Sequence, residues 1–339
     1  LVGSEMCIRD RVYMLDNSIR DRALGAIVGA AVGDALGASY EFLTASEIAS
    51  QGDITMRPGW STAKESSQDT RTAGEWTDDT AMSTVILQTA ATHHELLSTA
   101  VLDSIAAGFQ DWADTNPATI GTQTKQVLHM SHARTADALL RDSKHLPGTR
   151  KGGNGSLMRT APVALAYLGE GKGADAVEAA GMISDLTHYD LRARQACRLW
   201  TLGIRHAILV GTVQGVLSYL QNYAEPEEQR FWVKHFQAAE QADIADHVET
   251  NGWVVDALVC AWHAIATTPG RGSEHFRGAI QKAVSLDHDT DTVACIAGAL
   301  LGACWGASAI PTEWVSCLHG YPGWTAADLE RLVDEVLAG

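Results

Sequence analysis

Glycine recurs at four-residue intervals in two apolar segments of this chain: Gly25, Gly29, Gly33 and Gly37, and later Gly298, Gly302 and Gly306. Residues four apart lie on one face of an α-helix, so each series predicts a helix face without side chains, which another backbone can approach closely. Each glycine inside a helix costs about 1 kcal/mol relative to alanine, which favours a packing role. We expect the two helices to pack against each other; a bias towards small residues without specific contact is the alternative. The contact would bring together four acidic side chains: Asp34, Glu41, Asp289 and Asp291.

The rest of the chain is also helical in character. Ala- and Leu-rich segments with apolar residues at helical spacing are separated by Gly, Pro or polar clusters, and alternating strand patterns are few. We predict an all-α fold, a compact single-domain helical bundle, with helices at about 17–38, 78–97, 99–113, 119–143, 157–168, 173–186, 190–209, 227–240, 253–267, 274–284, 291–307 and 325–338. The polar insert 44–76 and the glycine-rich loop 147–156 are the main irregular segments, and such loops often carry function.

Composition limits the class of protein. With 339 residues, of which 46% are hydrophobic, the chain can bury a substantial core, which excludes a mainly disordered protein. Its 41 acidic residues against 25 Lys and Arg give a formal net charge of −16, so we expect no stable binding to nucleic acid, which usually needs a basic face. The six cysteines include no Cys-x-x-Cys pair, and we expect them to be reduced, in a cytoplasmic protein.

The uncharged stretch from Thr292 to Thr312 is long enough to suggest a membrane span. It is rich in Gly and Ala, contains Pro311, and follows an acidic run that begins at Asp287. We therefore expect a buried helix in the protein core and no membrane association.

The first residues, LVGSEMCIRDRVY, mix charged with apolar side chains and lack the continuous apolar stretch of a signal peptide. They resemble the translated adapter sequence that can precede a true start in assembled genomes, with Met14 as the expected initiator. We interpret residues 1–13 as a non-native leader and 14–339 as the functional domain.

Two patches place oxygen ligands beside predicted helix starts: residues 76–80, which read WTDDT, and residues 287–292, which read DHDTDT. Adjacent carboxylates repel each other unless a cation or a helix amino terminus compensates their charge. Oxygen-only ligands favour Mg²⁺, Ca²⁺ or Mn²⁺ over zinc. If the two patches converge, they provide enough carboxylates for a two-metal site, in which the metals stand about 3.5–4 Å apart.

The patches have three other interpretations. Each patch could be only a helix cap, because Asp and Thr are favoured there. An EF-hand loop starting at Asp287 would need Gly and Glu where Thr292 and Gly298 stand, so it fits poorly. The segment from Asp289 to Val293 also fits the Asp-x-Asp-x-Thr/Val pattern of haloacid dehalogenase-like phosphatases, but that pattern belongs after a buried strand near the start of a chain.

Four separated segments together resemble the ADP-ribosylglycohydrolase family: GAAVGDALGASYEF at 29–42, EWTDDTAM at 75–82, KGGNGSLMRTAP at 151–162 and DTDTVACIAGALLGA at 289–303. They stand in the family's order and span nearly the whole chain. The resemblance implies a compact all-helical domain with a binuclear Mg²⁺ or Mn²⁺ centre at the floor of a cleft. It also implies hydrolysis of the bond between the anomeric ribose carbon and an acceptor atom, which releases ADP-ribose from a modified protein or another ADP-ribose conjugate.

Matched position by position, the resemblance implies one metal held by Thr77, Asp78 and Asp79, another held by Asp289 and Thr292, and Asp291 bridging both. Glu41 matches a glutamate that approaches a metal or its water in some members. Glu41, Asp78 and Asp291 are the expected catalytic residues. Glu41 is the candidate base for the attacking water, and metal binding is an equally credible role for it. Two cations can orient ribose hydroxyls and activate water while oxocarbenium character develops at the anomeric carbon.

The expected substrate-binding residues are Gly152, Gly153, Asn154, Gly155, Ser156 and His188. Glycines let backbone amides approach an anion, and a helix predicted to begin near Leu157 would add its positive dipole end, so the loop suits a diphosphate. His188 belongs to a Thr-His pair that resembles one lining the family's cleft; a helix-capping Thr187 beside a partly exposed His188 is the alternative. We expect Arg159 to be structural, and Asp34 to brace the site through hydrogen bonds.

Two departures from the family leave the acceptor open. Thr119 stands where members acting on ADP-ribosyl-arginine often have Asp, and Asp287 stands where Gly is usual. ADP-ribose linked to arginine, serine, nucleic acid or a small molecule therefore remains a candidate substrate. A noncatalytic, crystallin-like member that only binds ADP-ribose is the alternative function, although retention of all the acidic metal-shell positions favours the enzyme.

Overall fold

The structure is a computed structural model that describes residues 2–59, 71–148, 151–241, 244, 248, 250–286 and 288–339, with the backbone alone for residues 2–16. The described helices are α1 (Val2–Gly37), α2 (Ala45–Ser50), α3 (Asp78–His93), α4 (Thr99–Asp114), α5 (Thr122–Met130), α6 (Ala136–Lys144), α7 (Ala161–Ala166), α8 (Gly173–Asp185), α9 (Leu191–Val210), α10 (Val216–Asn222), α11 (Pro226–Ala239), α12 (Val254–Thr267), α13 (Gly272–Ser285), α14 (Thr290–Trp305), α15 (Thr312–Val315) and α16 (Ala326–Ala338). Short 3₁₀ turns are η1 (Ala38–Tyr40), η2 (Val213–Gly215) and η3 (Ala307–Ala309), and one hairpin pairs β1 (His319–Gly320) with β2 (Trp324–Thr325). The expected all-α fold is confirmed.

The two glycine series face each other across the most extensive helix pair, α1 with α14. A Cβ atom added at Gly29 would collide with the carbonyl of Gly298, and one added at Gly302 would collide with the carbonyl of Gly25. The helix backbones therefore touch where side chains are absent. The predicted packing of the two glycine faces is confirmed, and the alternative of a mere compositional bias is wrong.

This contact continues to the end of α1, where it places the acidic residues. A Cβ at Gly37 would lie 2.5 Å from the Cα of Asp291, so α1 ends directly against the start of α14. The Thr290 hydroxyl donates to the Gly37 carbonyl over 2.9 Å. The chain then turns through η1, which sets Glu41 beside the first turn of α14.

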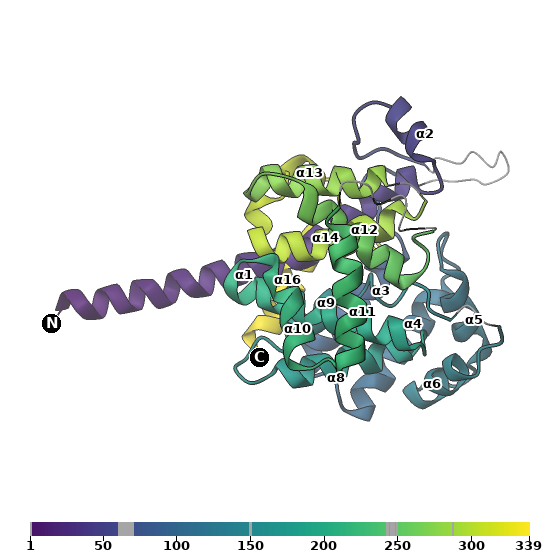
Figure 1. Ribbon diagram of the computed structural model, residues 1–339. Helices are drawn as coiled ribbons and strands as arrows, with labels where there is room; N and C mark the ends of the chain where they lie inside the picture. Colours follow the sequence, from purple (N-terminus) through teal and green to yellow (C-terminus); the bar gives the residue numbers. More distant parts are fainter. Residues whose placement is uncertain are drawn as a thin grey trace.

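The helix pair α1 and α14 is surrounded by other helices. Helices α9, α12 and α13 contact α14, and α3, α9 and α16 contact α1. Figure 1 shows α1 entering the body of the molecule from one side, α2 at its margin, and α5 and α6 on the side opposite the amino terminus. The segment Asn17–Tyr40 is long and apolar enough to span a membrane, but its apolar window is entirely buried. The expected core helix within 292–312 is confirmed, because Thr290 to Cys304 of α14 are all buried.

Several predicted helix bounds are wrong for reasons visible in the structure. The helix expected over 119–143 is two helices, because the Ser131 carbonyl accepts from Gln110 and the Ala136 amide donates to Asp103. The helix expected from 157 begins at Ala161, because Pro162 fits only the first turn of a helix. Helices α2, α10 and α15 were not predicted.

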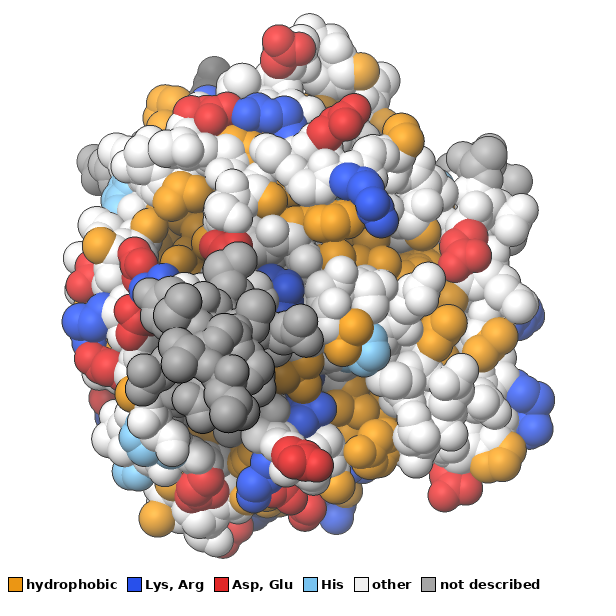
Figure 2. Space-filling model, turned by 90° about the vertical axis from the view of Figure 1, so that its left-hand side faces the viewer, with side chains coloured by type: hydrophobic (Ala, Val, Ile, Leu, Met, Phe, Trp, Pro, Cys, Tyr) orange, Lys and Arg blue, Asp and Glu red, His pale blue; other side chains and the backbone are white. Residues whose placement is uncertain are grey.

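The face from which α1 emerges carries charges of both signs. Figure 2 shows Lys and Arg side chains interspersed with Asp and Glu side chains among its described residues, with apolar atoms between them. Arg20 of α1 pairs with Glu330 and Asp334 of α16. The five cysteines whose side chains are described are free thiols, and four of them are buried.

Candidate active site

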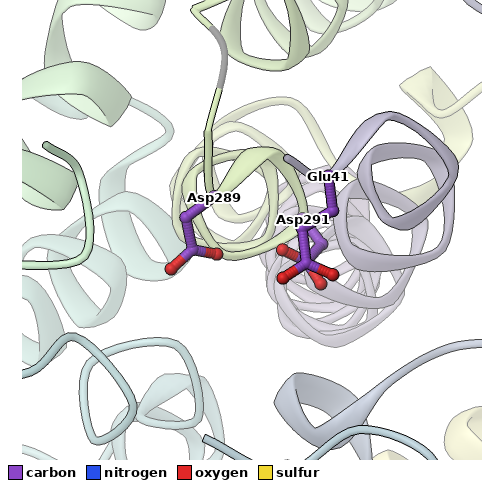
Figure 3. Close-up of side chains that lie close together, drawn as sticks. All are labelled: Glu41, Asp289 and Asp291. Carbon is purple, nitrogen blue, oxygen red and sulfur yellow. The ribbon is translucent and has the colours of Figure 1, made fainter. Parts of the chain in front are cut away.

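Three carboxylates lie together where the end of α1 meets the start of α14. Oxygen atoms of Glu41, Asp289 and Asp291 lie within 4.8 Å of one another. Figure 3 shows the group at the start of α14, with Glu41 reaching it from the segment after η1. Asp291 is buried, whereas Glu41 and Asp289 are half-buried, so the group can be reached from one side. The predicted approach of Glu41 to Asp289 and Asp291 is confirmed.

The start of α3 adds two further carboxylates, those of Asp78 and Asp79. We call these two together with Glu41, Asp289 and Asp291 the acidic group. The Thr292 hydroxyl on α14 donates to Oδ1 of Asp79 over 3.4 Å, which connects the two acidic patches. Asp79 is 2% exposed, yet its Oδ2 has no hydrogen-bond partner among the described residues. A buried carboxylate oxygen without a partner needs a cation or a proton, because an unsatisfied buried acceptor is costly. Asp78 is oriented differently, with its Oδ2 accepting from the Gly121 amide over 3.0 Å.

The capping interpretation of these patches is wrong for the residues at the helix starts. Thr77 and Asp289 are the N-cap residues of α3 and α14, and neither side chain makes a capping hydrogen bond in its described helix. Asp34 of α1 caps α3 instead. It is fully buried and accepts hydrogen bonds from the backbone amides and hydroxyls of Thr77 and Thr80.

Burial and mutual repulsion change the acidity of the whole group. Burial, with Asp289 and Asp78 nearby, raises the pKa of Glu41 to about 9. Burial also raises the pKa of Asp78 to about 6, and it holds the pKa values of Asp79 and Asp291 well above their usual range. These carboxylates repel one another unless positive charge lies among them. The donor set consists of oxygens alone and suits hard divalent cations.

Strained backbone flanks the acidic group on both sides. Phe42 and His288 have φ angles of 64° and 57°, in the left-handed region that residues other than glycine rarely adopt. The Phe42 amide donates to the His288 carbonyl over 2.7 Å, and the His288 amide donates to the Leu43 carbonyl over 3.3 Å. This backbone pair fixes the chain directions at Glu41 and Asp289. Such strain often marks functional sites.

The glycine-rich loop runs outward from the acidic group along a second segment. Asn154 donates from Nδ2 to Oδ2 of Asp289 over 2.7 Å and to the Asn251 carbonyl over 3.0 Å. Next to Asn154, Gly153 forms an antiparallel bridge with Trp253, and the Val254 amide donates to the Gly152 carbonyl. The loop is thus held at its inner end by a residue of the acidic group.

The remaining expected substrate residues divide between the loop surface and the core. Cβ atoms at Gly153 and Gly155 would lie 3.3 Å from Nε2 of His188, so that ring faces the loop backbone. Ser156 is 1% exposed, and its Oγ accepts from Ser184 over 2.9 Å, so its hydroxyl belongs to the core. The loop continues as a turn and not directly as a helix, because α7 begins only at Ala161. The expected helix dipole at Leu157 is therefore wrong.

His188 belongs to a buried relay that starts at Arg159. The Arg159 Nη2 donates to the Thr187 hydroxyl over 2.8 Å, and that hydroxyl lies 2.8 Å from Nδ1 of His188. His188 is 1% exposed, and burial together with Arg159 holds its pKa well below the usual range. The alternative of a capping Thr187 beside a partly exposed His188 is wrong, because Asp190 caps α9 and His188 is buried. Arg159 is structural as expected, although it lies in a turn.

Sequence reasoning missed several residues of this region. Asn251 accepts at Oδ1 from the Asp289 amide over 3.0 Å, and Gln123 accepts at Oε1 from the Gly153 amide over 3.4 Å. Trp253 is 42% exposed, and its Nε1 would lie 3.2 Å from a Cβ at Gly152. The Asn251-Gly252 pair is a turn signal, but only the fold shows that it meets Asp289. Asp287, which departs from the family pattern, lies outside the described residues.

Comparisons with known proteins agree on one family. The family model described as ADP-ribosylglycohydrolase matches residues 15–339. The chain belongs to the ADP-ribosylglycohydrolase family. It is similar to ADP-ribosyl-[dinitrogen reductase] glycohydrolase of Rhodospirillum rubrum, with 29% identity over 96% of this chain and 98% of the relative. ADP-ribosylarginine hydrolase Tri1 of Pseudomonas putida is 26% identical over 87% of this chain and 73% of its own length.

More distant members and a solved structure agree with this membership. ADP-ribosylhydrolase ARH3 of Danio rerio is 23% identical over 87% of this chain and 86% of its own length. A solved structure named ADP-ribosylglycohydrolase-related protein complex superposes with a TM-score of 0.71 at 25% identity, covering 95% of this chain and 99% of the other. The ADP-ribosylglycohydrolase fold is therefore shown over nearly the whole chain. Family membership supports an ADP-ribose–acceptor glycohydrolase activity.

Proposed function

We propose that this chain is a metal-dependent ADP-ribosyl-acceptor hydrolase whose acidic group holds two divalent cations, Mg²⁺ or Mn²⁺. One observation carries the proposal. Asp79 offers a buried Oδ2 without a hydrogen-bond partner among the described residues, beside three carboxylates whose oxygens lie within 4.8 Å of one another. Hard oxygen ligands at this density fit two divalent cations, which would neutralise the mutual repulsion described above.

The proposed ligands come from two helix starts. Residues from the start of α3 would hold one cation and residues from the start of α14 the other, with Asp291 between them: Thr77, Asp78, Asp79, Asp289, Asp291 and Thr292. When bound, the cations supply Lewis acidity and fix the ribose hydroxyls. The contact of the Thr292 hydroxyl with Asp79 supports a single site built from both helices.

Glu41 is the proposed base for the attacking water. Burial beside other carboxylates raises its pKa to about 9, and positive charge in the acidic group lowers that pKa again. The Glu41 carboxylate is then ionised near neutral pH and can accept a proton from water as the glycosidic bond breaks. Asp78 and Asp291 are proposed to act beside it, by holding the ribose and the cations in place.

The glycine-rich loop is the proposed diphosphate site. Glycines let an anion approach a loop backbone closely, and His188 faces the loop at Gly153 and Gly155. The hydroxyl of Thr187, which accepts from Arg159, can give its own hydrogen to Nδ1 of His188. The neutral ring then presents Nε2–H towards the loop, as a donor to a phosphate oxygen.

The substrate is proposed to be an ADP-ribosylated protein or another ADP-ribose conjugate. One relative is named for dinitrogen reductase and another for ADP-ribosylarginine, so arginine-linked substrates are included. Thr119 stands where an Asp is expected in arginine-specific members. Serine-, nucleic-acid- and small-molecule-linked ADP-ribose therefore also remain proposed substrates. Cytoplasmic location, the domain bounds 14–339 and the leader 1–13 stay predictions.

The test is mass-spectrometric detection of free ADP-ribose. The purified chain, stripped with a chelator and then supplied with Mg²⁺ or Mn²⁺, is offered arginine-, serine- and nucleotide-linked ADP-ribose. We expect release from at least one conjugate with either cation and none in the chelator. If ADP-ribose binds in calorimetry but no conjugate is cleaved, the noncatalytic alternative is correct.

A further inference from the structure

Asp34 lies at the junction of three helices, outside the set of expected metal ligands. It belongs to α1 and is completely buried. Its Oδ1 accepts from the Thr77 amide over 3.0 Å and from the Thr77 hydroxyl over 2.8 Å. Its Oδ2 accepts from the Thr80 amide over 3.0 Å and from the Thr80 hydroxyl over 2.6 Å. One carboxylate on α1 therefore receives four donors from the first turn of α3.

The position of Asp34 is fixed by the glycine contact beside it. A Cβ at Gly33 would collide with the backbone of Ala294, and a Cβ at Gly37 would collide with that of Asp291. The α1 backbone around Asp34 is therefore pressed against α14, and it can shift little without moving that helix. Asp34 thus holds the start of α3 at a set distance from the start of α14.

The Thr77 hydroxyl donates its hydrogen to Asp34. A threonine hydroxyl has one hydrogen and two lone pairs. Its hydrogen goes to Oδ1 of Asp34 over 2.8 Å, so only its lone pairs remain for other partners. A metal ligand must present a lone pair, and a second group that takes up the ligand's hydrogen orients it correctly. The Thr77 side chain is not needed as a cap, because Asp34 accepts from the Thr80 amide, which a capping side chain would otherwise accept.

We propose that Asp34 is a positioning residue for the metal centre, which directs the Thr77 hydroxyl oxygen to a cation. This inference rests on the proposed function, because it needs a cation beside Thr77. It goes beyond that function by assigning a role to a residue that binds neither metal nor substrate. The opposing account is that Asp34 is only a helix cap, which stabilises the fold without acting through Thr77.

A double-variant cycle separates the two accounts. Mn²⁺ dissociation constants are measured by calorimetry for the wild-type chain, Asp34→Asn, Thr77→Val and the double variant, and thermal midpoints are recorded without metal. We expect Asp34→Asn to weaken Mn²⁺ binding by about 10–100-fold, as usual for a partner that orients a metal ligand. In the Thr77→Val background it should cause no further loss, because the residue through which it acts is gone. The variant Thr77→Ser keeps the hydroxyl and should therefore bind Mn²⁺ about as tightly as the wild-type chain, unlike Thr77→Val.

The results that overturn the proposal are equally specific. Losses that add in the double variant, or an Asp34→Asn variant with unchanged Mn²⁺ affinity, would mean that Asp34 is only a cap. If Asp34→Asn does not fold, Thr80→Val removes one donor to Asp34 and leaves Thr77 intact. Thr80→Val should weaken Mn²⁺ binding measurably when Thr77 is present and should have no effect when it is combined with Thr77→Val. Equal effects in both cases would overturn the proposal. A wild-type chain that binds no Mn²⁺ would contradict the proposed function itself.

Discussion

The Asn154 amide donates to Oδ2 of Asp289 over 2.7 Å, so the glycine-rich loop and the acidic group share a hydrogen bond. The other hydrogen of the same Nδ2 goes to the Asn251 carbonyl over 3.0 Å, while the Asn251 Oδ1 accepts from the Asp289 amide. Asn154 and Asn251 therefore hold Asp289 from two sides. We therefore expect a change in the loop to affect Asp289 through these contacts.

Replacing Asn154 by Ala should weaken both metal and ADP-ribose binding. The change frees Asp289 and loosens the inner end of the loop, so we expect about a 10-fold loss of Mn²⁺ affinity. Calorimetry with Mn²⁺ and then with ADP-ribose measures both constants. Asn222→Ala is the matched control, because that exposed amide donates only to the Ser218 carbonyl among the described residues. Unchanged Mn²⁺ affinity in Asn154→Ala would mean that Asp289 needs no such support.

Adding a methyl group to the glycine contact should destabilise the fold. Gly302→Ala places a Cβ against the carbonyl of Gly25, and neither helix backbone can move aside without disturbing the core. We expect a loss of about 3 kcal/mol in the free energy of unfolding, measured in urea, because overpacking a tight contact usually costs this much. Gly169→Ala is the control, since a Cβ there meets only the flexible Lys172 side chain, at 3.5 Å. Equal effects of the two changes would contradict the close backbone contact.

These two examples show what the sequence could and could not predict. The glycine spacing predicted the α1–α14 contact and, through it, the approach of Glu41 to Asp289 and Asp291, because helix periodicity determines which residues share a face. It could not predict the break near Ser131 or the link between Asn251 and Asp289, because both depend on residues distant in the chain. Pro162 indicates where α7 begins, but the apolar pattern before it predicts a helix that starts too early.

The stabilisation that Mn²⁺ gives should increase with pH. Burial raises the folded-state pKa of Glu41 from 4.5 to about 9 and that of Asp78 from 3.8 to about 6. A carboxyl group whose pKa is raised in the folded state stabilises the metal-free fold fully at pH values below its pKa in the unfolded chain. That stabilisation is lost as pH rises through its folded-state pKa. Cations must displace those protons at low pH, whereas at high pH they meet ionised carboxylates.

Thermal midpoints with and without Mn²⁺ at pH 5.5, 7 and 8.5 measure this effect. We expect the metal-induced rise to be small at pH 5.5 and largest at pH 8.5. The comparison is made at one total metal concentration, because stabilisation by a ligand depends on its concentration. A rise of the same size at all three pH values would contradict cation binding at the raised carboxylates.

Replacing Arg159 by Lys should weaken the fold and the loop together. Arg159 is fully buried, lies over the Phe109 ring at 4.4 Å, and donates to the Ile183 carbonyl and the Thr187 hydroxyl. A lysine lacks the planar fork that makes these contacts at once, so we expect a loss of about 3 kcal/mol in unfolding free energy. ADP-ribose affinity should also fall, because Thr187 no longer orients His188.

Urea unfolding and ADP-ribose calorimetry check this pair of effects. Arg230→Lys is the control, because Arg230 is exposed on α11. A variant with normal stability and normal ADP-ribose affinity would show that the Arg159–Thr187–His188 relay supports neither.

The most direct test of the proposed centre is ADP-ribose release by Asp291→Ala. Asp291 is buried beside Glu41 and Asp289 and is the proposed bridge between two cations, so its loss removes a ligand from both. Turnover of the best conjugate is measured with saturating Mn²⁺, with Asp114→Ala as a control that alters an exposed ion pair with Arg134. We predict no release above the uncatalysed rate for Asp291→Ala and weakened Mn²⁺ binding, with normal release for the control. A folded Asp291→Ala chain that releases ADP-ribose at the wild-type rate would contradict the two-cation site.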